Sequence, residues 1–278
     1  MPISRTTLGS SRPITIHAPA GTIVNPVLPA ACAARGLTGF RLGDLMMGAL
    51  AQIAPEKVCA AGEGGNTGIT IGGYDADRNP FIFVEFVCGS WGGRYDKDGI
   101  EGITNWCENL CNTPVEVVEA EHPVRIEQYG FVPDTGGAGK FRGGLALIRD
   151  YRLLEEEAVL QVRSDRRRFL PYGLQGGKPG TPSLNILNPD GEHRVLPTQF
   201  TMTMKRGDLL RHIMPGGGGY GVPWERDIER VLDDLRNEKI TPEYARKAYG
   251  VVVDPVTLEV DEAATAALRQ QMQREHQQ

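Results

Sequence analysis

Residues 134–154 read DTGGAGKFRGGLALIRDYRLL, a glycine-rich element that leads directly into an apolar strand pattern. The same alternation recurs along most of the chain, where short apolar segments are separated by glycine. The 35 glycines and 19 prolines therefore punctuate ordered segments and do not form a low-complexity region. Short strands at this spacing predict a β-rich body of the sandwich or barrel-like type.

The helical patterns lie mainly beyond Gly221. DIERVLDDLRNEKI has helical apolar spacing, and TPEYARKAYG offers Thr241 as an N-cap and Gly250 as a stop. The sequence thus predicts an α+β fold, with a β-rich body and glycine-rich turns over 1–221 and a helical tail over 222–278. Short helices bury little by themselves, so we expect this tail to dock on a partner subunit.

One further helix is predicted at 41–54, and its apolar face consists of Leu42, Leu45, Met46, Ala49, Leu50 and Ile53. The segment 81–89, FIFVEFVCG, is typical of a strand buried on both faces. Other strand patterns lie at 12–28 (strand, turn, strand), 68–73, 115–134 (two strands), 144–154, 159–163, 183–187, 200–204 and 209–213.

The composition excludes several classes of protein. A net charge of −5 and the lack of a basic stripe argue against a nucleic-acid partner. No apolar run approaches the ~20 residues that span a bilayer, and the first residues lack the apolar centre of a signal peptide, so we expect a cytoplasmic protein without a membrane partner. The five cysteines and five histidines show no disulfide framework and no metal-ligand spacing, so no metal site is predicted in this chain.

Three glycine-rich elements have two interpretations. They span 134–144, 173–180 and 214–221, and the last contains Gly216, Gly217, Gly218 and Gly219. Glycine lets backbone N–H groups approach an anion closely. None of the three lies in a P-loop or GxGxxG context, so bulges and turns with positive φ are the favoured interpretation. An anion-binding or interface role stays open for Gly216–Gly219.

SDRRR, at 164–168, places Asp165 beside Arg166, Arg167 and Arg168. If the strand continued, Arg166 and Arg168 would share one face. Guanidinium groups pair well with carboxylates, and the acidic run 155–157 lies a hairpin's length away, so internal ion pairing is the favoured interpretation. The alternative is that these residues bind a substrate anion or a neighbouring subunit.

Three further residues are candidates for a substrate or interface site. Glu63 and Asn66 lie in the glycine-rich loop AGEGGNTG, and Glu85 lies inside an apolar strand. A carboxylate in an apolar strand is costly unless it is paired or functional, and Arg94 is an obvious partner. No GxSxG element or other nucleophile signature is present, so the catalytic residues are unknown at this point.

The order of motifs resembles the C-terminal half of the hydantoinase B/oxoprolinase family, which includes N-methylhydantoinase B subunits and the related acetone carboxylase large subunits. The resemblance runs from about residue 12 to 268. Its most specific motifs are GGAGKFRGG, SDRRR and PGGGGYG; the others are RPITIHAPAGTIVNP, GDLMMGALAQIAP, the segment from DGIEGITNWCENLCNTPVEVVEAEHPVRIEQYGFVPDT to GGAGKFRGG, and the region from RHIMPGGGGYG to ARKAYGVV.

The resemblance implies a heteromeric, ATP-dependent enzyme that hydrolyses a cyclic amide such as a hydantoin, lactam or oxoproline. An ATP-binding A-type subunit phosphorylates the substrate, and the B-type subunit acts on the activated species. The family's metal-ligating residues lie in the N-terminal half, so a divalent metal is expected on a separate N-terminal-half chain. By itself this chain is expected to be inactive. A ketone carboxylase subunit and a noncatalytic scaffold are the alternatives. The family's HxH-like element is replaced here by a segment containing Trp106. This residue is a candidate pocket wall, but a buried structural indole is the favoured interpretation.

Overall fold

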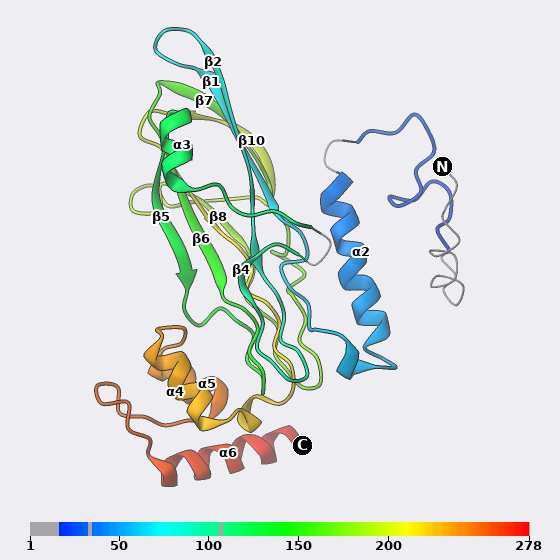
Figure 1. Cartoon of the computed structure of the whole chain (residues 1–278), viewed down its shortest axis with the longest axis vertical. Helices are drawn as coiled ribbons and strands as arrows, with labels where there is room; N and C mark the ends of the chain where they lie inside the picture. The colour runs from blue at the N-terminus through cyan, green and yellow to red at the C-terminus, as the bar shows by residue number, and fades with distance from the viewer. Residues whose placement is uncertain (1–16, 33–34, 106–107, 278) are drawn as a thin grey trace. The chain divides into compact units, whose positions relative to one another are not determined.

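The computed structural model of the chain describes residues 17–32, 35–105 and 108–277 (Figure 1). The chain divides into two compact units, Met1–Gly39 and Phe40–Gln278. In the first unit, the segment expected as two strands over 12–28 shows one bridge between Thr22 and Asn25 within residues 17–28, and residues 12–16 lie outside the described part. All the remaining strands belong to the second unit.

The strands of the second unit form two large antiparallel sheets and one small one. The four-stranded sheet has the order β10-β7-β1-β2, and the five-stranded sheet has the order β5-β6-β11-β8-β9. The strands of the two sheets are β1 (Thr67–Tyr74), β2 (Pro80–Val87), β5 (Val124–Val132), β6 (Ala146–Leu153), β7 (Glu157–Arg163), β8 (Leu184–Leu187), β9 (Arg194–Leu196), β10 (Gln199–Lys205) and β11 (Leu209–Ile213). A short pair, β3 (Gly89–Ser90) and β4 (Glu101–Ile103), lies outside them.

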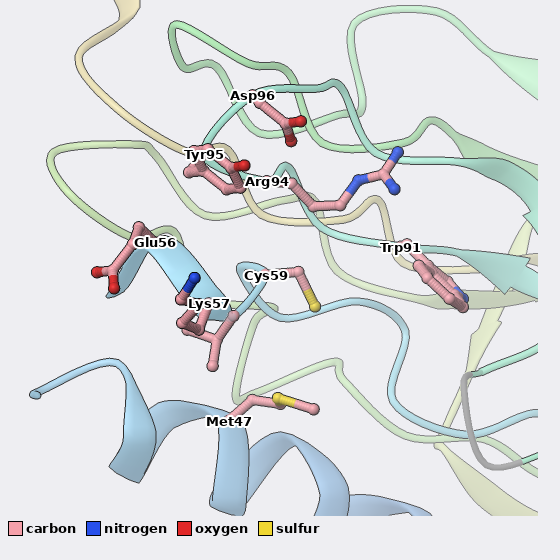
Figure 2. Close-up of a pocket in the computed structure, with 9 residues that line it drawn as sticks. Met47, Glu56, Lys57, Cys59, Trp91, Arg94, Tyr95 and Asp96 are labelled. Atoms are coloured by element: carbon pink, nitrogen blue, oxygen red, sulfur yellow. The ribbon is translucent and has the colours of Figure 1, made fainter. Parts of the chain in front are cut away.

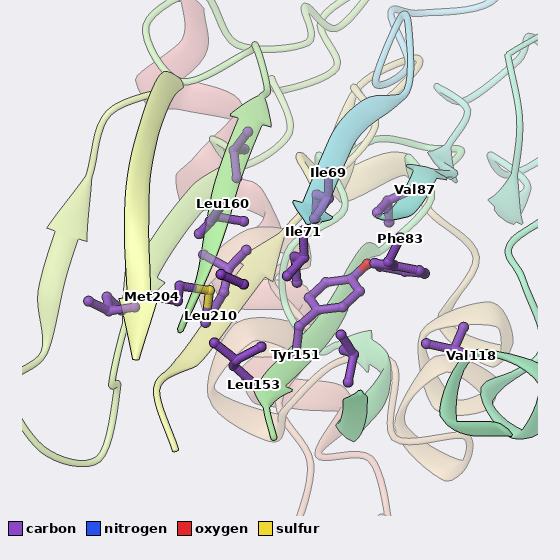
Figure 3. Close-up of a cluster of buried hydrophobic side chains, with 14 of the residues drawn as sticks. Ile69, Ile71, Phe83, Val87, Val118, Tyr151, Leu153, Leu160, Met204 and Leu210 are labelled. Atoms are coloured by element: carbon purple, nitrogen blue, oxygen red, sulfur yellow. The ribbon is translucent and has the colours of Figure 1, made fainter. Parts of the chain in front are cut away.

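The two large sheets enclose one apolar core (Figure 3). Ile69, Ile71 and Leu160 from the four-stranded sheet pack in the same cluster as Tyr151 and Leu210 from the five-stranded sheet. Alternate side chains of each strand point inward, as β geometry requires. The expected α+β class is confirmed, and its body is a sandwich of open sheets with no closed barrel among the described strands.

Strand β2 differs from the sequence prediction. It lies at the edge of its sheet, and its burial alternates, so that Ile82, Val84 and Phe86 are exposed while Phe83 and Val87 enter the core. The prediction of burial on both faces was wrong because the continuous apolar run includes side chains on the uncovered outer face of the sandwich.

Glycine builds a second kind of interior, in which backbone segments pack directly against one another. The N–H groups of Gly217, Gly218 and Gly219 donate in turn to the carbonyl oxygens of Gly144, Ala61 and Lys178, at 2.8, 2.8 and 2.9 Å. Three successive donors thus reach three different segments. A Cβ atom on any of the three glycines would lie within 2.3 Å of a neighbouring backbone atom.

This packing corrects the explanation for Gly216–Gly219. None of the four has a positive φ, so they are not tight turns. Glycine is required at these four positions because backbone atoms of neighbouring segments occupy the space that a side chain would need. We name the segments that meet here, residues 60–62, 91–93, 135–144, 172–181 and 215–221, the glycine core.

The helices lie outside the two large sheets (Figure 1), and the longest of those described have 16 residues. Helix α2 spans Arg35–Leu50, and the 3₁₀ turn η1 (Pro55–Lys57) follows it. Helix α3 (Val115–Glu121) stands where a strand was predicted. The alternating valines misled the prediction, because Val115 and Val118 also share a helical face and Val118 is the one that enters the core.

The C-terminal segment begins with the 3₁₀ turn η2 (Pro223–Glu225) and contains α4 (Ile228–Arg236), α5 (Pro242–Tyr249) and α6 (Glu262–Gln277). The predicted caps of α5 are confirmed: the Thr241 hydroxyl accepts from the Tyr244 N–H at 3.1 Å, and Gly250 has a φ of +64°. Ala138 of the body lies in the same apolar cluster as the helices.

Buried charges join this segment to the body of its own chain. Asp234 of α4 lies 3.3 Å from the Arg142 guanidinium and 2.7 Å from that of Arg226, which also contacts Asp98 at 2.7 Å. The boundary at 221/222 and the docking of the tail on a partner stay predictions.

Candidate functional site

The loop AGEGGN between η1 and β1 holds Glu63 in an enclosed position. Glu63 is 1% exposed, and its N–H donates to the Ser90 carbonyl oxygen at 2.9 Å. Gly64 (φ +73°) and Gly65 (φ +158°) reverse the chain, so the Gly65 N–H donates back to Glu63 Oε2 at 2.9 Å. A side chain at Gly64 would be both strained and obstructed. The two glycines therefore hold the carboxyl group in place.

The environment of Glu63 favours the protonated, uncharged form of its carboxyl group. Burial raises its pKa to about 8, against the opposing effects of the Gly65 N–H and Arg41. Its Oε1 atom is buried and has no hydrogen-bond partner among the described residues. A carboxyl group with this pKa carries a proton at neutral pH and can donate or recover it.

Two ion pairs fix the backbone around Glu63. Arg166 pairs with Asp44 of α2, and the Arg41 Nε lies 2.6 Å from Asp165 Oδ2. Arg41 also donates to the Glu63 carbonyl oxygen, as does Arg166 Nε at 3.4 Å. Burial raises the pKa of Asp44 and lowers that of Arg166. Both pairs join α2 to the segment that follows β7. Removing one partner of the Arg166–Asp44 pair would leave a buried charge, whereas Asp165 is exposed.

A third carboxylate, Glu108, organises the other side of the loop. Its Oε2 accepts hydrogen bonds from Asn66 Nδ2 and Thr104 Oγ1, both at 2.6 Å, and from Asn105 Nδ2 at 2.9 Å. The Thr104 carbonyl oxygen accepts from the Trp91 indole N–H at 2.7 Å. Glu108 was not predicted, because nothing in its local pattern shows that it meets Asn66. The prediction for Trp106 lies outside the described residues.

A cavity of about 240 Å³ lies beside this cluster (Figure 2). Cys59 and Trp91 line it and also line a narrow cleft that includes Glu63 and Asp44. The other lining residues are Met47, Glu56, Lys57, Val58, Arg94, Tyr95 and Asp96. The cavity and the neutral acid therefore share a wall.

The cavity combines an apolar wall with two cationic side chains, Lys57 and Arg94, and two acidic ones, Glu56 and Asp96. Lys57 and Arg94 form no ion pair with any residue in 17–32, 35–105 or 108–277, and Arg94 Nη2 donates to the Asp98 carbonyl oxygen at 3.2 Å. Burial raises the pKa of Cys59, which disfavours the thiolate and a nucleophilic role. The arrangement can hold a small, partly apolar molecule that bears an anionic group.

Glu85 lies elsewhere, in the sandwich core. It pairs with Arg149 at 3.1 Å and accepts hydrogen bonds from the Tyr151 hydroxyl at 2.7 Å and the Thr113 N–H at 3.1 Å. The expected pairing of Glu85 with an arginine is confirmed, but the partner is Arg149 and not Arg94. This glutamate is satisfied by its surroundings and does not face the cavity.

The SDRRR segment begins where β7 ends and is not a strand. Arg166 has a φ of +62°, so the alternation expected for Arg166 and Arg168 does not occur. Arg167 donates to the Leu196 carbonyl oxygen at 2.8 Å, and the Arg168 guanidinium lies 5.7 Å from the centre of the exposed Phe169 ring.

The expected pairing of these arginines with 155–157 was wrong. That acidic run precedes and begins β7, whereas the arginines follow its other end. Arg206 and Lys205 pair with Glu156 and Glu157 instead.

Gly216–Gly219 lie in the glycine core. Their N–H groups already donate, with Gly216 reaching the Thr181 hydroxyl at 3.4 Å, so an anion would have to displace internal hydrogen bonds. The structure thus brings Glu63, Asp165 and Arg166 together around Asp44 and Arg41, with Asn66 on the far side of the loop.

The described residues contain no cluster of three or more His, Cys, Asp or Glu side chains that could hold a metal ion. The divalent metal that the family resemblance implies is expected on a separate N-terminal-half chain, and that expectation stays a prediction. Within the same residues, no helix is long and apolar enough to cross a membrane.

Known proteins show extensive similarity to the chain. It is 35% identical over 94% of its length to a putative D-/L-hydantoinase B subunit of Pseudomonas sp. (strain NS671), and 33% identical over 90% to the beta subunit of the caprolactamase of Pseudomonas jessenii. It spans 44% and 45% of these relatives, so it corresponds to less than half of each.

Two solved structures share the fold. The ATP-dependent caprolactamase from Pseudomonas jessenii matches 92% of this chain, and 46% of its own, with a TM-score of 0.83 and 31% identity. An acetone carboxylase matches 82% of this chain and 35% of its own with a TM-score of 0.65 and 21% identity, which is a likeness of fold. The model of the hydantoinase B/oxoprolinase family matches residues 2–223, and the chain therefore belongs to that family.

Proposed function

We propose that this chain forms part of an ATP-dependent enzyme complex that hydrolyses a cyclic amide, and that the cavity beside Glu63 receives the activated substrate. The relatives named as a hydantoinase B subunit, a caprolactamase beta subunit and a 5-oxoprolinase support the reaction class. The observation that carries the role of this chain is the buried Glu63, whose Oε1 has no hydrogen-bond partner among the described residues and which lines a cleft that shares Cys59 and Trp91 with the cavity containing Lys57 and Arg94.

The chemistry requires an acid at this place. An A-type, ATP-binding subunit would phosphorylate the amide oxygen, because an unactivated amide is a poor electrophile. Water then adds to the amide carbon, and the resulting intermediate can lose either phosphate, which restores the amide, or the ring nitrogen, which opens the ring. A proton delivered to nitrogen makes the amine the leaving group.

In this proposal Glu63 supplies that proton. The ring C–N bond breaks, its electron pair goes to nitrogen, and the Glu63 proton completes the amine. The hydroxyl group that came from water forms the carbonyl of the acyl phosphate and gives its proton to the Glu63 carboxylate, which restores the neutral acid. The acyl phosphate that remains is hydrolysed by a second water to a carboxylate and phosphate. Lys57 and Arg94 would bind the phosphoryl group by charge, since neither has a carboxylate partner within the described residues. No step is assigned to a metal, which a separate N-terminal-half chain would bind.

The complex, recovered from its own cells through a tag on this chain, provides the test. Native mass spectrometry should find an A-type subunit and the other half of the B-type chain. ATP turnover should depend on a hydantoin, a lactam or oxoproline. Dependence on bicarbonate and a ketone would instead indicate a carboxylase, and the absence of both activities would refute an enzymatic role.

Glu63→Gln should lower substrate-dependent turnover at least ~100-fold with assembly intact, as expected for the loss of a general acid. The matched control is Glu85→Gln, which removes another buried carboxyl group but lies away from the cavity. We expect it to reduce stability and to leave the turnover of the intact complex within about threefold. Equal losses in both variants would contradict the assignment of Glu63.

Variants of Arg166 and Arg168 distinguish a functional site from a noncatalytic scaffold. Arg166→Ala leaves Asp44 unpaired beside Glu63, whereas Arg168→Ala removes an exposed guanidinium. A scaffold would lose subunits from the complex, while a site would lose turnover with the subunits retained. The proposal places the complex in the cytoplasm, where ATP is available, and this chain is expected to be inactive alone.

A further inference from the structure

Helix α2 is oriented with its apolar face outward. Leu45 is 68% exposed, and Leu42, Met46 and Leu50 are also exposed, as is Ile53 immediately after the helix. These positions, spaced by three and four residues, form a single stripe. We name Leu42, Leu45, Met46, Leu50 and Ile53 the α2 stripe.

The opposite face of α2 contacts the body through polar groups, through Gly48 and through Phe40, whose ring lies against Gly65. Asp44 pairs with Arg166, and the Asp44 carbonyl oxygen accepts from the Tyr172 hydroxyl at 2.7 Å. A Cβ atom on Gly48 would lie 2.9 Å from that hydroxyl, so the helix packs closely there. The ion pair and the hydrogen bond fix which face of α2 turns inward. The α2 stripe is therefore held in an exposed position by the contacts on the opposite face of the helix.

The α2 stripe contains no charged residue. A contiguous apolar surface on a helix that is held by ion pairs marks an interaction site. An interface of this composition resembles that of a permanent assembly, in which the buried centre is apolar and charges are depleted.

We infer that the α2 stripe is the docking surface for the half of the hydantoinase B chain that this chain does not cover. The relatives are more than twice as long as the segment they share with this chain, so each carries a second half of at least equal size. In the same helix, Met47 lines the cavity beside Glu63 (Figure 2). A polypeptide seated on the stripe would therefore border the cavity and complete its wall, an extension that rests on the proposed function.

Site-specific photo-crosslinking in the intact complex tests this surface. A benzophenone amino acid at Leu45 should crosslink to a peptide whose sequence matches the N-terminal half of the hydantoinase B family. The same group at Val256, which is 88% exposed and lies between α5 and α6, is the matched control and should give no such product. Crosslinks from Leu45 to a second copy of this chain, to residues 1–39, or to an A-type subunit would overturn the inference, as would the absence of any crosslink.

A pair of variants gives an independent measure. Leu45→Glu should reduce recovery of the other half at least tenfold, whereas Val256→Glu should leave it unchanged. Because both side chains are exposed, neither variant should shift the melting temperature of the isolated chain by more than about 2 °C. Unchanged recovery with Leu45→Glu would contradict the inference.

These readouts do not depend on turnover. A complex that crosslinks as expected but hydrolyses no cyclic amide would refute the proposed function and preserve the docking surface.

Discussion

Replacing Glu63 by Gln should make the stability of the chain less dependent on pH. Burial raises the pKa of this carboxyl group from 4.5 to about 8, so the folded chain keeps a proton that the unfolded chain releases. Since the unfolded state binds fewer protons between these two values, the free energy of unfolding falls as the pH rises through this window. Glutamine stays neutral throughout and removes this loss.

The magnitude follows from the two pKa values. A rise of one pH unit between them costs the folded state up to about 1.4 kcal/mol. From pH 5 to pH 8 the wild-type chain should therefore lose about 3–4 kcal/mol relative to Glu63→Gln, with little further change above pH 9. Other groups titrate in this range, but they are common to both proteins and cancel in the comparison.

Urea denaturation of both proteins at pH 5, 6, 7, 8 and 9 measures the difference directly. The slope against urea concentration must be the same for the two, so that the midpoints report stability. A difference that stays constant within about 0.5 kcal/mol from pH 5 to pH 8 would show that Glu63 is ionised in the folded chain, and its role as a proton donor would fail with it.

Three other perturbations test the packing. Gly217→Ala should cost about 3 kcal/mol or more, or prevent folding, because the new methyl group would lie 2.2 Å from a backbone oxygen, whereas Gly130→Ala, with nothing within 4 Å, should stay within about 1 kcal/mol by thermal denaturation. Burial lowers the pKa of His212 to about 3, so its imidazole stays neutral in the folded chain while that of the unfolded chain gains a proton as the pH falls. The free energy of unfolding of the wild type should therefore fall by about 3 kcal/mol between pH 7 and pH 4 relative to His212→Gln, as measured by urea denaturation. No difference between the two proteins would contradict burial of a neutral imidazole. Asp234→Ala should lower the free energy of unfolding by about 3 kcal/mol, because it leaves two buried guanidinium groups short of a partner. A change in that free energy below about 0.5 kcal/mol would contradict the network.

Local patterns were sufficient for most of the fold. Apolar alternation located β1, β6, β7 and β11, and cap chemistry fixed α5 through Thr241 and Gly250. Helix α3 was mistaken for a strand because its valines satisfy both periods. Which face of β2 or α2 turns outward depends on the elements that pack against it. The sequence of a single segment does not show which elements these are.

The candidate site was predicted in part, for a related reason. Glu63 stood out as a carboxylate between glycines, and Arg166 as a member of a basic run. The pairing of Arg166 with Asp44 joins residues 122 positions apart, and no local spacing encodes it. Glu108 was missed because its role depends on Asn66 and Thr104, which reach it through the folded chain.

The glycine core affects how the stability of the chain responds to temperature. Exposure of apolar surface on unfolding raises the heat capacity, whereas exposure of peptide groups lowers it. Unfolding the glycine core exposes mainly peptide groups and therefore lowers the heat-capacity change. The heat-capacity change of unfolding should therefore fall below the ~12–15 cal/mol/K per residue usual for globular proteins. The resulting stability curve would be broad, so the chain would lose little stability on cooling or on moderate warming.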